Sequence, residues 1–171
     1  AGGGDGPGGV GAAPAGGCRA YDGASGPWGV GEAEPMSLDT VGWFASMPRP
    51  LSCAAAMQLV EQGRLQLDEP ALRWAPGLAD ARVLEGFDAK GGPLLRPPKR
   101  PITLRHLLTH TSGYGYGMWN ASLARYMELT GIPGTASCEN AALQLPLLFD
   151  PGERWNYGIN LEWVGKVIEG A

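Results

Sequence analysis

The clearest alternation of apolar and polar positions lies between Ser46 and Gly63. Apolar residues recur there at helical spacing and form one broad face: Leu51, Ala54, Ala55, Met57, Leu59 and Val60. Gly63 ends the pattern, because glycine commonly follows the last residue of a helix. Pro48 and Pro50 fall in the first turn, where the backbone amides have no partner within the helix. The pattern therefore predicts a helix that starts after Ser46 and stops at Gly63.

Residues typical of helix caps precede four further helical segments. These caps are Thr103, Asn120, Ser137 and Asn160. The first segment is expected to end at Ser112-Gly113, and the third at Pro146. The last covers 161–169, with an apolar stripe formed by Leu161, Val164, Val167 and Ile168. Between the third and the fourth, the sequence Asp-Pro-Gly-Glu at 150–153 predicts a turn.

The pattern is much weaker before residue 45. Residues 1–17 hold nine glycines and a single strand-forming residue, Val10, so they bury too little apolar surface to offset chain entropy and are predicted to be disordered. Residues 19–21 and 28–30 carry weak strand signals on either side of a Gly-rich stretch, which predicts a short hairpin. We therefore expect one partial domain over 18–171, of α+β class and dominated by helices.

Composition narrows the classes of function. The 171 residues are 44% apolar and carry a formal charge of −4, which gives no reason to expect nucleic acid or acidic lipid as a partner. No apolar run approaches the roughly 20 residues that span a bilayer. The chain begins with Ala rather than Met, which is consistent with processing or a partial gene model, and its start lacks the basic and apolar regions of a signal peptide. Compartment and oligomeric state stay open.

The cysteines and histidines do not predict a metal or cofactor. Three cysteines lie far apart without a C-x-x-C spacing, so neither a disulfide framework nor a zinc cluster is expected. His106 and His110 have the i, i+4 spacing of a zinc pair, but Leu107 stands where the glutamate of H-E-x-x-H belongs. We therefore interpret the two histidines as structural.

Ser46 and Arg49 form the most informative pair of polar residues. Three residues apart at the start of a helix, their side chains fall on one face and within reach of each other. Serine hydrolases of the S-x-x-K type use this spacing, with lysine helping the serine hydroxyl to lose its proton. Arginine is never deprotonated in a protein, so Arg49 offers charge without basicity.

Three stretches carry a resemblance to a known family. They are Ala-Ser-Met-Pro-Arg-Pro at 45–50, continuing to Gln-Leu-Val-Glu-Gln-Gly at 58–63; Leu-Leu-Thr-His-Thr-Ser-Gly at 107–113; and Pro-Gly-Glu-Arg-Trp-Asn-Tyr-Gly at 151–158. In this order and spacing, residues 27–171 resemble the beta-lactamase-related serine hydrolases. That group includes class C beta-lactamases, penicillin-binding carboxypeptidases, family VIII esterases and fungal acyltransferases. Each signature alone is weak, and together they are specific.

The resemblance implies a fold and a set of roles. The fold is the beta-lactamase/transpeptidase type, an antiparallel sheet flanked by helices, of which this chain holds an incomplete part. Ser46 matches the nucleophile, with its own backbone amide as half of an oxyanion hole. Tyr157 matches the tyrosine that assists proton transfer. The asparagine expected two residues later is displaced to Asn160, a substrate-binding candidate, and the family's third motif, on a late strand, does not occur before residue 171.

Each assignment has a structural alternative. Serine also favours the N-cap position of a helix, although the flanking signatures favour Ser46 as the nucleophile. Tyr157 is equally suited to be a core aromatic residue with a bonded hydroxyl. Three further aromatic residues are candidates either for an acyl pocket or for a surface loop: Tyr114, Tyr116 and Trp119. Ser112 is expected only to terminate a helix.

Two hypotheses about function follow. The first is a serine hydrolase or acyltransferase that acts on a small ester or amide through an acyl-serine intermediate, impaired because Arg49 replaces the lysine and the third motif is missing. The second is an inactive relative or truncated fragment that binds a small molecule or a partner. Under either hypothesis, Arg49→Lys alone is not expected to restore turnover.

Overall fold

The computed structural model describes residues 7–171, and the chain divides into two compact units, Ala1–Ala45 and Ser46–Ala171. The boundary lies immediately before Ser46, whereas composition predicts one after residue 17. The difference arises because residues 18–45 group with the segment before them into one compact unit.

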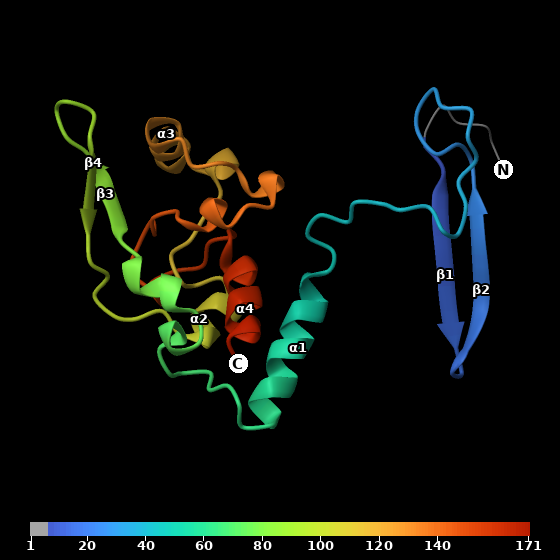
Figure 1. The fold of residues 1–171 in the computed structure, drawn as a ribbon, viewed down its shortest axis with the longest axis horizontal. Helices are drawn as coiled ribbons and strands as arrows, with labels where there is room; N and C mark the ends of the chain where they lie inside the picture. The colour runs from blue at the N-terminus through green and yellow to red at the C-terminus, as the bar shows by residue number, and fades with distance from the viewer. Residues whose placement is uncertain (1–6) are drawn as a thin grey trace. The chain divides into compact units, whose positions relative to one another are not determined.

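The first unit is built on a hairpin of β1 (Gly9–Ala15) and β2 (Cys18–Ser25), drawn in blue in Figure 1. Gly16 and Gly17 connect the strands with φ of +57° and +79°, the left-handed conformation that a two-residue hairpin turn requires. The expectation of disorder over 1–17 is therefore wrong for 9–15, and residues 1–6 lie outside the described residues. The expected second strand at 28–30 is a turn, in which the Trp28 amide donates to the Glu34 carbonyl.

The second unit holds four α-helices and one strand pair among the described residues. They are α1 (Arg49–Glu61), β3 (Val83–Phe87), β4 (Pro93–Arg96), α2 (Leu104–Leu108), α3 (Ala121–Thr130) and α4 (Asn160–Glu169), with short 3₁₀ helices at Ala71–Arg73, Pro76–Asp80, Gly117–Trp119, Thr135–Ser137 and Asn140–Leu143. β3 and β4 pair antiparallel. The unit is thus α+β and dominated by helices, as the sequence predicts.

The core of the second unit surrounds α4. This helix packs against both α1 and α2, and α1 runs beside it in Figure 1. The fully buried apolar side chains come from several elements: Ala56, Leu65, Leu104, Leu107, Leu123, Leu147, Ile159, Val164 and Val167. Burying such side chains removes apolar surface from water and supplies the main driving force for folding. The predicted apolar stripe of the last helix is confirmed by the burial of Leu161, Val164 and Val167.

The predicted long helix forms, but it buries a narrower face than its sequence suggests. α1 begins at Arg49 and its fully buried residue is Ala56, with Cys53, Leu59 and Val60 packed beside it. Leu51 is 73% exposed, so the broad apolar face is only partly used. The N-cap residue is Pro48, without a side-chain cap. Ser46 is therefore not the helix cap, and one alternative for its hydroxyl is removed.

The other predicted caps have different outcomes. Thr103 caps α2 by accepting a hydrogen bond from the His106 amide, and Asn120 caps α3 by accepting one from the Leu123 amide. α2 stops at Leu108, well before Ser112. Ser137 ends a 3₁₀ helix instead of starting an α-helix, because Cys138 follows it in the left-handed conformation (φ +58°). Asn160 is the first residue of α4, and its side chain makes no cap.

A cluster of charged side chains, Arg96, Lys99 and Asp150, ties β4 to the turn at 150–153. Asp150 is 1% exposed, and each of its oxygens accepts two hydrogen bonds or ion-pair contacts. Arg96 forms a bidentate pair with Asp150, with hydrogen bonds of 2.9 and 2.8 Å. The hydrogen bonds from Arg96 hold the pKa of the Asp150 carboxyl well below its usual range. We call this group the Asp150 cluster; it anchors the segment that leads to Tyr157.

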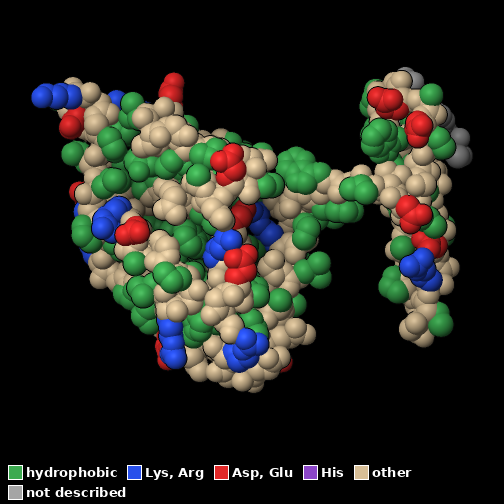
Figure 2. Space-filling model, in the orientation of Figure 1, with side chains coloured by type: hydrophobic (Ala, Val, Ile, Leu, Met, Phe, Trp, Pro, Cys, Tyr) green, Lys and Arg blue, Asp and Glu red, His purple; other side chains and the backbone are tan. Residues whose placement is uncertain are grey.

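Basic and acidic side chains are scattered over the surface. Figure 2 shows them interspersed with apolar and neutral groups on the face in view, without a field of one sign. This agrees with the small net charge of −4. Among the residues that the structure describes, no helix is both long enough and apolar enough to cross a bilayer.

Candidate active site

Ser46 and Tyr157 lie at one guanidinium group. Ser46 is exposed just before α1, and its Oγ accepts a hydrogen bond of 2.7 Å from Nη1 of Arg49. The same Nη1 donates to the hydroxyl of Tyr157, although the two residues are 108 positions apart. The three residues that the family resemblance singles out are therefore brought together. Tyr157 also packs against the core, so its placement agrees both with a role beside Ser46 and with a core aromatic residue whose hydroxyl is bonded.

The second terminal nitrogen of Arg49 binds a different pair of groups. Nη2 donates to the hydroxyl of Tyr116 and, at 2.7 Å, to Oε1 of Glu162. The guanidinium carbon also lies 4.9 Å from the ring centre of Tyr157, close enough for a cation–π interaction. With an exposed fraction of 16%, the Arg49 side chain is held in one place by four polar partners. It orients the site but accepts no proton.

Tyr116 connects Arg49 to Glu162. Its hydroxyl donates to Oε1 of Glu162 at 2.7 Å while it accepts from Arg49. Burial, and then the hydrogen bond to the Glu162 carboxylate, raises the pKa of Tyr116 above its ordinary value, so its hydroxyl stays protonated. The rings of Tyr116 and Tyr157 meet edge to face, with centres 5.6 Å apart. Of the aromatic candidates, Tyr116 is the one that reaches the site.

Glu162 is a site residue that the sequence analysis missed. It lies in the first turn of α4, and sequence patterning assigns this helix only an apolar stripe. An acidic residue there is ordinarily explained by the helix dipole, so its pairing with Arg49 has no local signal. The second carboxylate oxygen, Oε2, is buried and has no hydrogen-bond partner among residues 7–171. A buried carboxylate oxygen without a partner is unusual and costs free energy.

Two glycines set the distance between the loops that carry the tyrosines. A Cβ placed on Gly158 would lie 2.5 Å from Cα of Gly115 and 2.6 Å from its amide nitrogen. Any side chain at Gly158 would therefore force the two loops apart. Tyr116 and Tyr157 each stand next to one of these glycines in sequence. The close contact of Gly115 and Gly158 thus allows one guanidinium group to bind both tyrosine hydroxyls.

Asn160 lies in the interior of the unit. It is completely buried, accepts a hydrogen bond of 2.5 Å from Ser112 and donates one of 3.0 Å to Nδ1 of His110. Its polar atoms are thus bonded inside the protein, and its role in substrate binding stays a prediction. Ser112, expected only to end a helix, is likewise a buried member of this network.

His110 contacts the site through Tyr157. The ring centres of the two residues are 5.0 Å apart, and Asn160 donates to Nδ1 of His110, which places the proton of the neutral imidazole on Nε2. Burial, and then the nearby positive charge of Arg49, lowers the pKa of His110 below its ordinary value. His106 instead completes the capping box of α2. No group of three potential metal ligands occurs within residues 7–171.

Tyr114 and Trp119 do not join the group of residues around Arg49. Tyr114 is 1% exposed and stacks on Trp163 in the core, and burial raises the pKa of its hydroxyl. Trp119 is 72% exposed. A cavity of about 360 Å³ borders Tyr116 and is lined mainly by apolar groups, among them Met118 and Met127. Of the three aromatic candidates, Tyr116 alone borders this cavity, and the acyl pocket stays a prediction.

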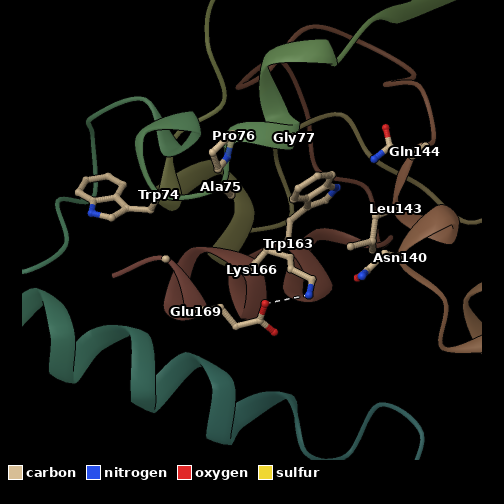
Figure 3. Close-up of a pocket in the computed structure, with 11 residues that line it drawn as sticks. Trp74, Ala75, Pro76, Gly77, Asn140, Leu143, Gln144, Trp163, Lys166 and Glu169 are labelled. Carbon is tan, nitrogen blue, oxygen red and sulfur yellow. Dashed lines mark hydrogen bonds and ion pairs between the residues drawn. The ribbon is translucent and has the colours of Figure 1, made fainter.

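Another cavity borders α4. It measures about 390 Å³, and Trp74, Pro76 and Trp163 contribute to its wall (Figure 3). Lys166 and Glu169 form an ion pair of 2.8 Å at its edge. Neither Ser46 nor Arg49 lines it. This cavity is thus separate from the arrangement of Ser46, Arg49, Tyr116, Tyr157 and Glu162, which we call the Ser46 site.

Comparison with known proteins identifies the family. The family model described as Beta-lactamase matches residues 2–171. The chain belongs to the beta-lactamase family. This confirms the resemblance stated from the three sequence stretches, and it identifies the α+β unit as part of a beta-lactamase/transpeptidase-like fold.

Similar proteins include fungal acyltransferases and an esterase. The beta-lactamase-family chain is 45% identical over 139 residues to acyltransferase mokF of Monascus pilosus, covering 80% of this chain and 33% of the relative. It is 41% identical over 146 residues to the lovastatin esterase of Penicillium rubens, covering 81% and 35%. The structure of unliganded simvastatin synthase (LovD) from Aspergillus terreus superimposes with a TM-score of 0.80 at 35% identity, covering 97% and 44%. The chain spans about a third of the length of these curated relatives.

Proposed function

We propose that Ser46 accepts the acyl group of a small ester or amide substrate and passes it to water or to an acceptor alcohol. The observation that supports this most directly is the single guanidinium that contacts both the Ser46 hydroxyl and the Tyr157 hydroxyl. Relatives named as acyltransferases and as an esterase support the same reaction class. The site would use two steps, acylation of Ser46 and transfer from it.

The proton of Ser46 needs an acceptor other than Arg49. In the proposed first step, Oγ of Ser46 bonds to the substrate carbonyl carbon, the bond to the leaving group breaks, and the Ser46 proton moves to the Tyr157 oxygen before it reaches the leaving group. Arg49 stabilises the phenolate form of Tyr157 by its charge. His110 is unsuited to this role, since its unprotonated nitrogen already accepts from Asn160. Phenols are mostly protonated at neutral pH, so we expect slow acylation that accelerates with alkalinity.

The cavity beside Tyr116 is suited to the acyl group. Its volume of about 360 Å³ and its lining by Met118 and Met127 favour a short, flexible apolar chain. Tyr116 lines this cavity, and its hydroxyl accepts a hydrogen bond from Arg49, which also donates to Ser46. Ester substrates with a small aliphatic acyl group are therefore the first to test.

Covalent labelling of Ser46 tests the proposal. A fluorophosphonate probe is expected to modify Ser46 in the wild-type chain and not in Ser46→Ala, with the modified residue identified by mass spectrometry. Ser52→Ala is the matched control, because Ser52 lies on the same helix without a role in the site. Tyr157→Phe is expected to slow labelling by about 100-fold, the lower end of the effect of a proton-transfer group. Equal labelling of Tyr157→Phe and the wild type would exclude Tyr157 as the acceptor.

A binding function without turnover is the second candidate. It is favoured by one observation: Arg49 donates to Ser46 and is itself neutralised by Glu162, which leaves no strong base in contact with the serine. This candidate predicts that a p-nitrophenyl ester of a short acid binds without release of p-nitrophenol and without labelling of Ser46 at any pH. Modification of Ser46 in the wild-type chain would decide for acyl transfer.

A further inference from the structure

The carboxylate of Glu162 is used on one side only. Oε1 accepts hydrogen bonds of 2.7 Å from both Arg49 and Tyr116, whereas the buried Oε2 has no partner in the part of the chain that the structure describes. A carboxylate that served stability alone would have both oxygens satisfied, because an unpaired buried oxygen costs free energy. The arrangement therefore indicates a role in the charge of the Ser46 site.

We propose that Glu162 is the charge-setting residue of the Ser46 site: its carboxylate balances the cation at position 49, holds the Arg49 guanidinium and the Tyr116 hydroxyl in place, and would favour the charged form of a lysine introduced at position 49. This inference rests on the proposed function for the role of Ser46, but it concerns a property of the site that is measurable without any reaction of Ser46. Glu162 touches Arg49 and Tyr116 and acts through them, so it is a positioning residue.

The charged and titratable groups around Glu162 come from several parts of the unit. Arg49 of α1 and Tyr116, from the segment before the 3₁₀ helix at Gly117–Trp119, bind its Oε1. The charge of Glu162 also acts on His110, which follows α2. Tyr157 is connected to Glu162 through the guanidinium of Arg49. Lys166, one turn later on α4, is paired with Glu169 instead. Arg49 and Glu162 therefore cancel each other's charge inside the site.

The same geometry explains why a lysine at position 49 would be a poor base. A carboxylate in hydrogen-bond contact with an ammonium group favours the charged form. The lysine introduced by Arg49→Lys would lie within reach of Glu162 and keep its proton at neutral pH. Removing the negative charge of Glu162 would lower the pKa of that lysine. Restoring a base therefore takes two changes, Arg49→Lys together with Glu162→Gln.

The direct test measures the protonation of the introduced lysine in variants of the full chain. Pulse acetylation across pH, read by residue-resolved mass spectrometry, reports the fraction of free amine, with Lys90, Lys99 and Lys166 as internal references. The acetylation midpoint at position 49 is expected to be at least about 1 pH unit lower in R49K/E162Q than in R49K. R49K/E162D keeps the charge and is expected to resemble R49K.

Matched variants separate charge from folding. R49K/E169Q removes one negative charge from the same helix at an ion pair remote from Arg49, and its acetylation midpoint at position 49 is expected to equal that of R49K. Where E162Q does not fold, as judged by circular dichroism, E162A removes the same charge. An unchanged midpoint at position 49 in a folded charge-removing variant would overturn the proposal.

Labelling of Ser46 then tells the two proposals apart. At neutral pH, R49K/E162Q is expected to react with a fluorophosphonate about tenfold faster than R49K, in line with one pH unit of extra free amine. A shifted acetylation midpoint without labelling of Ser46 in any variant supports the role of Glu162 and contradicts the acyl-transfer function. Faster labelling without a shifted midpoint contradicts the role of Glu162.

Discussion

Two arginine–carboxylate pairs in the second unit differ in how completely they are satisfied. In the Asp150 cluster, Arg96 and Lys99 together occupy both carboxylate oxygens, and Asp150 is 1% exposed. At the Ser46 site, Arg49 and Tyr116 share one oxygen of Glu162, and the other oxygen has no partner among the described residues. The first pair is built for stability, because a buried charge is tolerated only with complete pairing. The second gives up part of that stability to set the charge beside Ser46.

The largest expected effect comes from breaking the complete pair. Asp150→Asn replaces one acceptor oxygen by an NH₂ group that faces the donors of Arg96 or Lys99. Removing one partner of a buried pair is strongly destabilising, so the melting temperature is expected to fall by on the order of 10 °C. Thermal unfolding followed by circular dichroism measures the change. A melting temperature equal to that of the wild type would remove the distinction between the two pairs.

Lowering the pH is expected to remove the stabilising contribution of Asp150 without a mutation. Because the pKa of Asp150 is lowered in the folded protein, the unfolded chain binds more protons at low pH. The contribution of Asp150 to stability is therefore complete above the pKa of an unfolded aspartate, about 3.9, and is lost as pH falls below it. Urea unfolding between pH 6 and pH 2.5 is expected to show the stabilities of the wild type and D150N converging toward the acid end. A constant gap between them would contradict this assignment.

The smallest expected effect on stability comes from the incomplete pair. Glu162→Gln keeps an acceptor for Arg49 and Tyr116, and the pair is partly exposed, so the free energy of unfolding is expected to change by less than about 1 kcal/mol. E169Q is the matched control on the same helix. A loss as large as that of D150N would show that Glu162 serves stability, as Asp150 does.

Local signals predict the parts of the fold that local interactions decide. Thr103 and Asn120 cap their helices with neighbouring amides, as their sequence positions indicate. The same expectation is wrong for Asn160, because its buried partners Ser112 and His110 lie far away in the sequence and compete for its side chain. The strand at 9–15 is not predicted, because a glycine-rich composition is typical of disorder. The hairpin turn depends on Gly16 and Gly17, which do not stand out among the other glycines of this segment.

The site shows the same division. Ser46 and Arg49 are one turn apart, and the family resemblance adds Tyr157, so the sequence predicts that these three meet. Glu162 has no such signal, since it lies 113 residues from Arg49 and its helix position has an ordinary explanation. Sequence patterning identifies which face of α4 is buried. It does not reveal that one polar residue of that helix meets a cation on another helix.

The close contact of Gly115 and Gly158 limits how the Ser46 site can be redesigned. A methyl group at Gly158 would meet Gly115 backbone atoms at 2.5 Å, so the loops carrying Tyr116 and Tyr157 would separate. A single guanidinium would then no longer span the two hydroxyls, and a shorter side chain at position 49 would reach neither. The distance between the two loops and the length of the side chain at position 49 therefore depend on each other. An engineer who wishes to admit bulkier acyl groups by widening this gap must change both at once.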